Sequence, residues 1–220
     1  ILSLPFALTK DQQTAIKEIV EDLKSPQMMY RFLQGDVGSG KTVVSSVALY
    51  ANYLAGYQGA LMAPTEILAT QHYQTLSRFF ENTDVHIELL TGSLSLKEKE
   101  RVYQAIQSGE ADIVVGTHAL FQKKVVYHNL GFVITDEQHR FGVMQRKALK
   151  NKGQQVDFLI MSATPIPRTL AISMYGDMDV STIKTMPQGR LPVKTQYIHS
   201  SSMKPILKHL KSYLAQGGQC

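Results

Sequence analysis

Residues 35–42 read Gly35-Asp36-Val37-Gly38-Ser39-Gly40-Lys41-Thr42 and fit the pattern G-x-x-x-x-G-K-[ST] at every fixed position. The mostly apolar run 28–33 precedes this stretch, and the helical run 42–55 follows it. Glycines admit backbone conformations that bring N–H groups together, and the following helix points the positive end of its dipole at a bound anion. Lys41 supplies a cation for the outer phosphates, and the Thr42 hydroxyl can ligate magnesium. The stretch therefore predicts a nucleoside triphosphate site, with a chance glycine-rich loop as the alternative.

Two adjacent acids, Asp136 and Glu137, follow the run 132–135, which is apolar except for its last residue. Ligands of a parallel sheet bind beyond the carboxyl ends of its strands, so this pair and the phosphate loop are expected at one edge. Asp136 would hold magnesium, usually through water, and Glu137 would orient or deprotonate the attacking water. An Asp-Glu pair is often only a solvated surface pair, but beside a phosphate loop it favours triphosphate hydrolysis.

Apolar strand-like runs alternate with helical runs along most of the chain, and this alternation predicts an α/β fold with a mainly parallel sheet and helices on both faces. Thr9 and Ser95 are expected to cap helices. The helix after Ser95 is densely charged, which is more typical of a solvated face than of a binding patch. The predicted strands are 28–33, 59–63, 86–90, 112–115, 132–135 and 156–161, and the predicted helices begin near Thr9, Thr42, Pro64, Ser95 and Phe141.

The tail differs from the rest of the chain, because residues 187–192 contain two prolines and a glycine and are typical of a linker. A strand at 193–199 and a helix at 203–215 follow, and they resemble the opening of a second α/β unit. We therefore expect a first domain over 1–186, a linker over 187–192 and the truncated start of a second domain over 193–220. Since the chain begins with Ile1 rather than Met, it is expected to be a fragment.

Composition sets broad limits on partners and compartment. The 220 residues are 44% hydrophobic, and 23 Lys and Arg against 18 Asp and Glu give a net charge of +5 and a pI near 9.2. This surplus permits a polyanionic partner without establishing one. A single cysteine, Cys220, suits a reducing interior. The sequence shows neither a signal peptide nor an apolar run long enough to span a bilayer, so a cytoplasmic protein is expected.

Small polar residues gather at several predicted strand ends besides the phosphate loop. Hydroxyls, glycine N–H groups and helix starts can hold the phosphates of an extended polyanion. Each site alone is more often a turn or a helix cap, but together they favour a track for nucleic acid. The residues concerned are Pro64 and Thr65, Thr91 and Gly92, Thr117 and His118, and Ser162 and Thr164.

These segments resemble the motifs of superfamily-two helicases of the RecG type. Residues 63–72 resemble motif Ia, 116–120 motif Ic, 136–143 motif II and 162–170 an extended motif III, and the match continues at 175–181 and 187–190. It runs from about Leu4 to the end of the chain. The related transcription-repair coupling translocases typically read differently at three matching places, where this chain has Ser39, Glu66 and Gln138.

The resemblance implies a RecA-like domain and further site residues. Phe6 and Gln12 match an adenine-binding motif, although Phe6 could be a core anchor and Gln12 a helix-surface residue. Gln138, His139, Ser162 and Thr164 would couple the γ-phosphate site to the DNA path, with a packed, satisfied histidine as the alternative for His139. Arg140 and Arg168 would contact DNA or a second motor domain, or could be surface arginines.

By resemblance, the chain is the first motor domain of an ATP- and Mg²⁺-dependent DNA helicase that remodels stalled forks and Holliday junctions in bacterial recombination and repair. Its implied partners are branched double-stranded DNA and two parts that the chain lacks, a wedge domain and a complete second motor domain. The alternatives are a repair-coupling translocase, a P-loop kinase and a nucleotide-gated binding module without turnover. Without the second domain, the fragment is expected to bind ATP–Mg²⁺ but to hydrolyse it poorly.

Overall fold

The computed structural model describes residues 6–136, 155–163, 178–187 and 203–217, and the chain divides into two compact units, 1–188 and 189–220. The described part of the second unit is helix α7 (Met203–Ala215), which matches the predicted helix and exposes Leu207 and Leu214. The predicted helix at 141–150 and strand at 193–199 lie outside the described residues. The assignment of 193–220 to a second motor domain stays a prediction.

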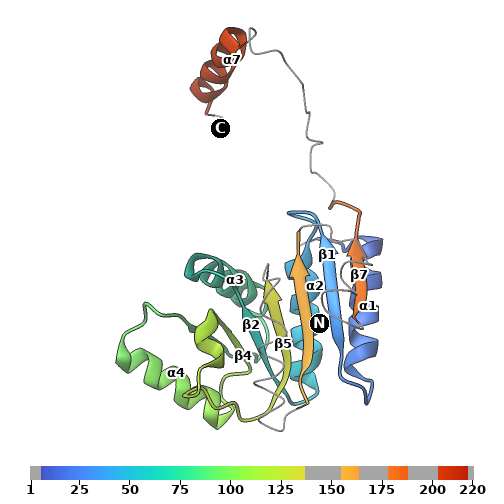
Figure 1. Cartoon of the computed structure of the whole chain (residues 1–220), viewed down its shortest axis with the longest axis vertical. Coiled ribbons are helices and arrows are strands. Elements are labelled where there is room, and N and C mark those ends of the chain that lie inside the picture. Colours follow the sequence, from blue (N-terminus) through green and yellow to red (C-terminus); the bar gives the residue numbers. More distant parts are fainter. Residues whose placement is uncertain (1–5, 137–154, 164–177, 188–202, 218–220) are drawn as a thin grey trace. The chain divides into compact units, whose positions relative to one another are not determined.

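The first unit is built on a seven-stranded sheet in the order β3-β4-β2-β5-β6-β1-β7 (Figure 1). Every strand pairing in the described sheet is parallel, which confirms the predicted fold class. Parallel neighbours need crossover connections, and the alternating strands and helices supply them. The strands are β1 (Tyr30–Gly35), β2 (Gln58–Met62), β3 (Ile87–Leu90), β4 (Ile113–Gly116), β5 (Leu130–Asp136), β6 (Asp157–Ser162) and β7 (Asp179–Ile183).

The helices begin where the capping residues predict. Thr9 and Ser95 form capping boxes with Gln12 and Glu98, and Thr65 accepts a hydrogen bond from the N–H of Leu68. None of the helices in the described ranges is long and apolar enough to cross a membrane. The helices of the first unit are α1 (Lys10–Leu23), α2 (Lys41–Leu54), α3 (Glu66–Phe79), α4 (Leu96–Ser108) and a short 3₁₀ turn, η1 (His118–Phe121).

Alternate strand residues pack into separate hydrophobic clusters, as expected for a sheet that is covered on both faces. Leu61 of β2 packs with buried residues of α1, α2 and α3, whereas its neighbours Ala60 and Met62 pack with α4. In β5, Phe132 and Ile134 join the first cluster and Val133 the second. The sheet therefore lies between α1, α2 and α3 on one face and α4 on the other.

The sheet ends at β7, a strand that the sequence pattern did not predict because its residues are largely polar. The buried Arg31 of β1 holds this edge together: its Nε donates to Asp22 of α1 at 2.7 Å, and its Nη1 donates to Ser181 of β7 at 3.0 Å. Just beyond β7, Asp11 of α1 accepts the backbone N–H groups of Lys184 and Thr185 and the Thr185 hydroxyl, at 2.8–2.9 Å. Side chains of α1 therefore fix both the edge strand and the segment that leaves it.

Candidate functional site

The phosphate loop connects β1 to α2 and depends on glycine geometry at two positions. Gly38 and Gly40 have φ angles of 76° and 88°, in the left-handed region that strains residues with a Cβ. At Gly35, an added Cβ would lie 2.5 Å from Oγ of Ser39 and 3.2 Å from Cβ of Ile183. The helix α2 begins at Lys41 without a side-chain cap. No side chain caps the first N–H groups of α2, which is the arrangement expected where a helix start binds an anion.

Two polar side chains of the loop, those of Lys41 and Asp36, bond to the loop's own backbone. Nζ of Lys41 donates to the carbonyl oxygens of Gly35 at 2.7 Å and Asp36 at 3.2 Å. The Asp36 carboxylate accepts the N–H of Val37 at 2.7 Å. The Ser39 hydroxyl is buried, and among the described residues its Oγ has no hydrogen-bond partner. A buried polar atom of this kind is a group that a bound phosphate or water would satisfy.

Gln12 reaches the loop from α1. Its Nε2 donates to the carbonyl oxygen of Ser39 at 2.8 Å, and its Oε1 accepts the N–H of Thr9 at 2.8 Å. Because Gln12 is 2% exposed, it is not a helix-surface residue. Phe6 is 48% exposed and is therefore not a core anchor. The role of both residues toward adenine stays a prediction.

The candidate magnesium carboxylate, Asp136, is the last residue of β5. Its Oδ2 accepts a hydrogen bond at 2.7 Å from Nε2 of His72, which lies on α3. The two side chains are 13% and 11% exposed. His72 was not predicted as a site residue, although it lies in the segment that resembles motif Ia. Only the strand order places the helix after β2 beside the end of β5, and a single sequence does not reveal that order.

The predicted magnesium ligand Asp136, the predicted coupling residue Ser162 and the phosphate loop lie at the ends of neighbouring strands. Ser162, the last residue of β6, is fully buried and pairs in register with Gln34 of β1, one residue before the phosphate loop. On the other side of β6, Asp136 pairs with Met161. Asp136, Ser162 and the loop 35–42 therefore lie next to one another at the carboxyl ends of β5, β6 and β1.

The predicted DNA-contact residues that the structure describes lie at the ends of the three strands on the other side, β2, β4 and β3. The N–H of Ala63 donates to the carbonyl of Gly116 at 2.8 Å, and an added Cβ at Gly92 would lie 2.8 Å from the Glu66 carboxylate. The hydrogen bond joins the ends of β2 and β4, and the short distance places Gly92, after β3, beside the start of α3, which follows β2. Gly92, Thr65 and His118 are exposed, Pro64 and Thr117 are partly exposed, and Thr91 is buried.

Part of the predicted site lies outside the described residues. Glu137, Gln138, His139 and Arg140 follow Asp136 directly, and Thr164 and Arg168 follow β6. Their proposed roles in water activation, coupling and DNA contact stay predictions.

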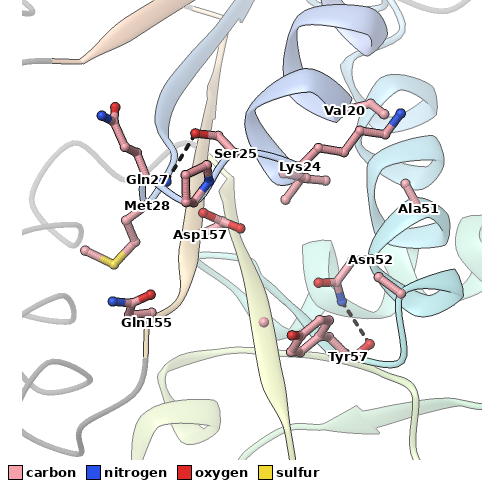
Figure 2. A pocket seen from close by; sticks show the side chains of 14 residues that line it. Val20, Lys24, Ser25, Gln27, Met28, Ala51, Asn52, Tyr57, Gln155 and Asp157 are labelled. Atoms are coloured by element: carbon pink, nitrogen blue, oxygen red, sulfur yellow. Dashed lines mark hydrogen bonds between the residues drawn. The ribbon is translucent and has the colours of Figure 1, made fainter.

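A pocket of about 360 Å³ lies at the opposite, amino-terminal edge of the sheet. Figure 2 shows it between the ends of α1 and α2 and the first residue of β6, Asp157. Burial raises the pKa of Asp157 to about 6, although a 2.6 Å hydrogen bond from the N–H of Met29 favours the charged form. Among the described residues that line the pocket, none is a predicted nucleotide or DNA residue.

The residues present fit a nucleotide with magnesium. Within the described ranges, no three His, Cys, Asp or Glu side chains cluster to form a metal site of their own. Mg²⁺ commonly uses one or two carboxylates together with substrate phosphates and water. Asp136 and Thr42 supply the protein's share of such ligands, and a nucleotide held by the phosphate loop would supply the phosphates.

Known proteins of one family are similar to this chain. The model of the DEAD/DEAH box helicase family matches residues 9–172. ATP-dependent DNA helicase RecG of Bacillus subtilis is 54% identical over 219 residues, which cover 100% of this chain and 32% of the relative. RecG of Streptococcus pneumoniae is 53% identical over 218 residues, covering 99% and 32%.

Among solved structures, RecG bound to a three-way DNA junction superposes with a TM-score of 0.88 at 47% identity, covering 99% of this chain and 29% of that one. The chain therefore spans about a third of the length of the curated relatives it matches. Because the family model covers most of the chain, this protein belongs to the DEAD/DEAH box helicase family, and its RecG relatives match it from end to end.

Proposed function

We propose that this chain is the first motor domain of a RecG-type helicase, which uses ATP and Mg²⁺ to remodel branched DNA in recombination and repair. The observation that carries the proposal is that the carboxyl ends of the strands divide into a nucleotide group and a DNA group. The phosphate loop, Asp136 and Ser162 occupy the ends of β1, β5 and β6, and the described residues among the predicted DNA contacts occupy the ends of β2, β3 and β4.

In this proposal, the N–H groups of the loop 35–42 hold the phosphates and Lys41 moves from its loop carbonyls to the outer phosphates. Thr42 and Asp136 hold Mg²⁺, which neutralises charge on the phosphate oxygens. Glu137 orients or deprotonates the attacking water. Phe6 and Gln12 bind adenine.

The DNA partner is inferred from the relatives and from the sheet edge. The solved relative with 47% identity is RecG bound to a three-way DNA junction. We propose that Pro64, Thr65, Gly92, Thr117 and His118 contact the phosphates of such DNA. A wedge domain and a second motor domain would complete the enzyme, acting in the bacterial cytoplasm at the nucleoid.

We further propose that the 220-residue chain alone binds ATP–Mg²⁺ but turns it over slowly. In related nucleotide hydrolases, an arginine supplied by another element raises the rate by about 10³–10⁵. Robust, DNA-stimulated ATPase activity from this chain alone would contradict this part of the proposal.

The full-length protein tests the function through two variants that separate binding from turnover. Lys41→Ala is expected to weaken ATP binding and to abolish unwinding of forked DNA. Glu137→Gln is expected to retain ATP binding and to lose ATPase activity by at least about 10²-fold, the scale of a lost general base. An unchanged ATPase rate in Glu137→Gln would exclude the catalytic assignment and favour a binding module without turnover.

A further inference from the structure

The hydrogen bond between His72 and Asp136 joins the two halves of the sheet edge. Asp136 ends β5, on the nucleotide side, and His72 belongs to the helix that follows β2, on the side of the predicted DNA contacts. β2 and β5 are neighbours, with Met62 in register with Thr135. The bond therefore spans the border between the strands that carry the two sets of predicted residues.

His72 occupies a position that the helix would ordinarily give to an apolar side chain. It lies three residues after Ala69 and four before Leu76, both fully buried in the cluster between α3 and the sheet. Positions three and four residues apart share one helix face, so His72 lies on the packed face of α3. A polar side chain on that face needs a partner, and Asp136 is that partner.

The pair has the chemistry of a metal-binding carboxylate and a neighbouring residue that orients it. A carboxylate that binds a metal ion is generally held by a hydrogen bond from a neighbouring group, which fixes its orientation. Nε2 of His72 donates to one oxygen of Asp136, and a carboxylate held through one oxygen can present the other to a cation. The packing of Ala69 and Leu76 fixes the helix from which the histidine reaches.

We propose that His72 is a positioning residue for magnesium: it holds the Asp136 carboxylate in the orientation that binds the ion of the ATP–Mg²⁺ complex. This inference rests on the proposed function, because it assigns the ligand role to Asp136. It adds a residue of α3 to the nucleotide site, one that lies 64 residues before Asp136 in the chain but next to it in space.

Magnesium-dependent nucleotide binding by the full-length protein tests the proposal without relying on turnover. A fluorescent, non-hydrolysable ATP analogue is titrated at increasing Mg²⁺, and again in EDTA. His72→Ala is expected to raise the Mg²⁺ concentration for half-maximal binding by about 10–100-fold, the usual cost of losing such a supporting group. Binding in EDTA is expected to stay unchanged. His72→Gln keeps an N–H donor and is expected to shift the magnesium dependence much less than His72→Ala does.

His86→Ala is the matched control. Nδ1 of His86 also lies near an acid, 3.7 Å from Oδ2 of Asp112, but His86 is 71% exposed and lies outside the two motifs that contain His72 and Asp136. This variant is expected to change nothing. Unchanged magnesium dependence in His72→Ala, or an equal shift in His72→Ala and His72→Gln, would overturn the positioning role alone. If the original protein failed to bind the ATP analogue at any Mg²⁺ concentration, the proposed function would fail with it. Circular dichroism confirms that each variant is folded.

Discussion

Gln12 of α1 holds the phosphate loop through a 2.8 Å hydrogen bond from its Nε2 to the carbonyl oxygen of Ser39. The same side chain completes the capping box of its own helix through Oε1 and the N–H of Thr9. One buried carboxamide therefore fixes the start of α1 and the conformation of the loop together. This arrangement does not depend on whether Gln12 also binds adenine.

Gln12→Ala is expected to lower affinity for an ATP analogue about tenfold, because it leaves the loop carbonyl without its buried donor, a loss of roughly 1–2 kcal/mol. Nucleotide titration of the 220-residue chain measures the change. Gln13→Ala serves as the control, since Gln13 makes an exposed 3.0 Å bond to the carbonyl of Leu8. Equal affinity in the two variants would show that the Gln12–Ser39 bond does not order the loop.

Two glycines with similar backbone angles allow the cost of backbone strain to be measured apart from the cost of a steric clash. Gly40 and Gly56 have φ angles of 88° and 83°, but an added Cβ at Gly40 would collide with the Gln12 amide, whereas at Gly56 it would meet nothing within 4 Å. Gly56→Ala is expected to cost about 1–2 kcal/mol of stability from backbone strain alone. Gly40→Ala is expected to cost more in urea unfolding and also to abolish nucleotide binding. Similar losses in both variants would contradict the predicted collision.

The pH dependence of stability should contain a contribution from Asp157. Its pKa is raised to about 6 in the fold, against an ordinary 3.8, so between these values the folded protein holds a proton that the unfolded chain has released. Stability from this group is therefore complete below pH 3.8 and is lost as the pH rises through 6.

Asp157→Asn removes the charge and keeps an oxygen for the N–H of Met29. It is expected to stabilise the protein by about 1 kcal/mol at pH 7.5, a value reduced for solvent screening of a partly exposed group, and to have little effect near pH 4. Urea unfolding at both pH values tests this expectation, with the exposed Glu81→Gln as the control. A variant that is equally stabilised at both pH values would show that charge burial is not the cause.

Arg31→Ala is expected to destabilise the first unit by about 1.5–3 kcal/mol, because it removes a charged hydrogen-bond partner from the partly exposed Asp22 and one of the two side-chain partners of the buried Ser181. Arg31→Lys keeps the charge but loses the forked geometry, and an intermediate loss is expected. Urea unfolding followed by circular dichroism measures both. Lys17→Ala, which removes an exposed 3.9 Å pair with Glu21, is expected to change stability by less than about 0.5 kcal/mol. A comparable loss of stability in Lys17→Ala would show that the Arg31 interactions stabilise the fold no more than an exposed ion pair does.

Local signals predicted most elements of this fold. Thr9 and Ser95 carry the donors and acceptors of a capping box within four residues, so the chain alone is enough to place these helix starts. The strands of the sheet interior are recognisable because both of their faces are buried. The strand β7 was missed because it lies at the end of the sheet, where Asp179 and Thr182 are exposed.

The interactions that cross the sheet could not be predicted from local signals. Arg31 interrupts an otherwise apolar strand, and its meaning appears only when Asp22 and Ser181 are brought beside it from α1 and β7. His72 meets Asp136, 64 residues later, for the same reason. Both contacts depend on which strands are neighbours, and hydrophobic patterning identifies strands without ordering them.

The three hydrogen bonds that Asp11 accepts from Lys184 and Thr185 have a mechanical consequence. Tension applied to the chain beyond Thr185 is resisted at Asp11, and the next residue, Gln12, holds the carbonyl of Ser39. Adjacent residues in the first turn of α1 therefore hold the segment that leaves the first unit and the phosphate loop.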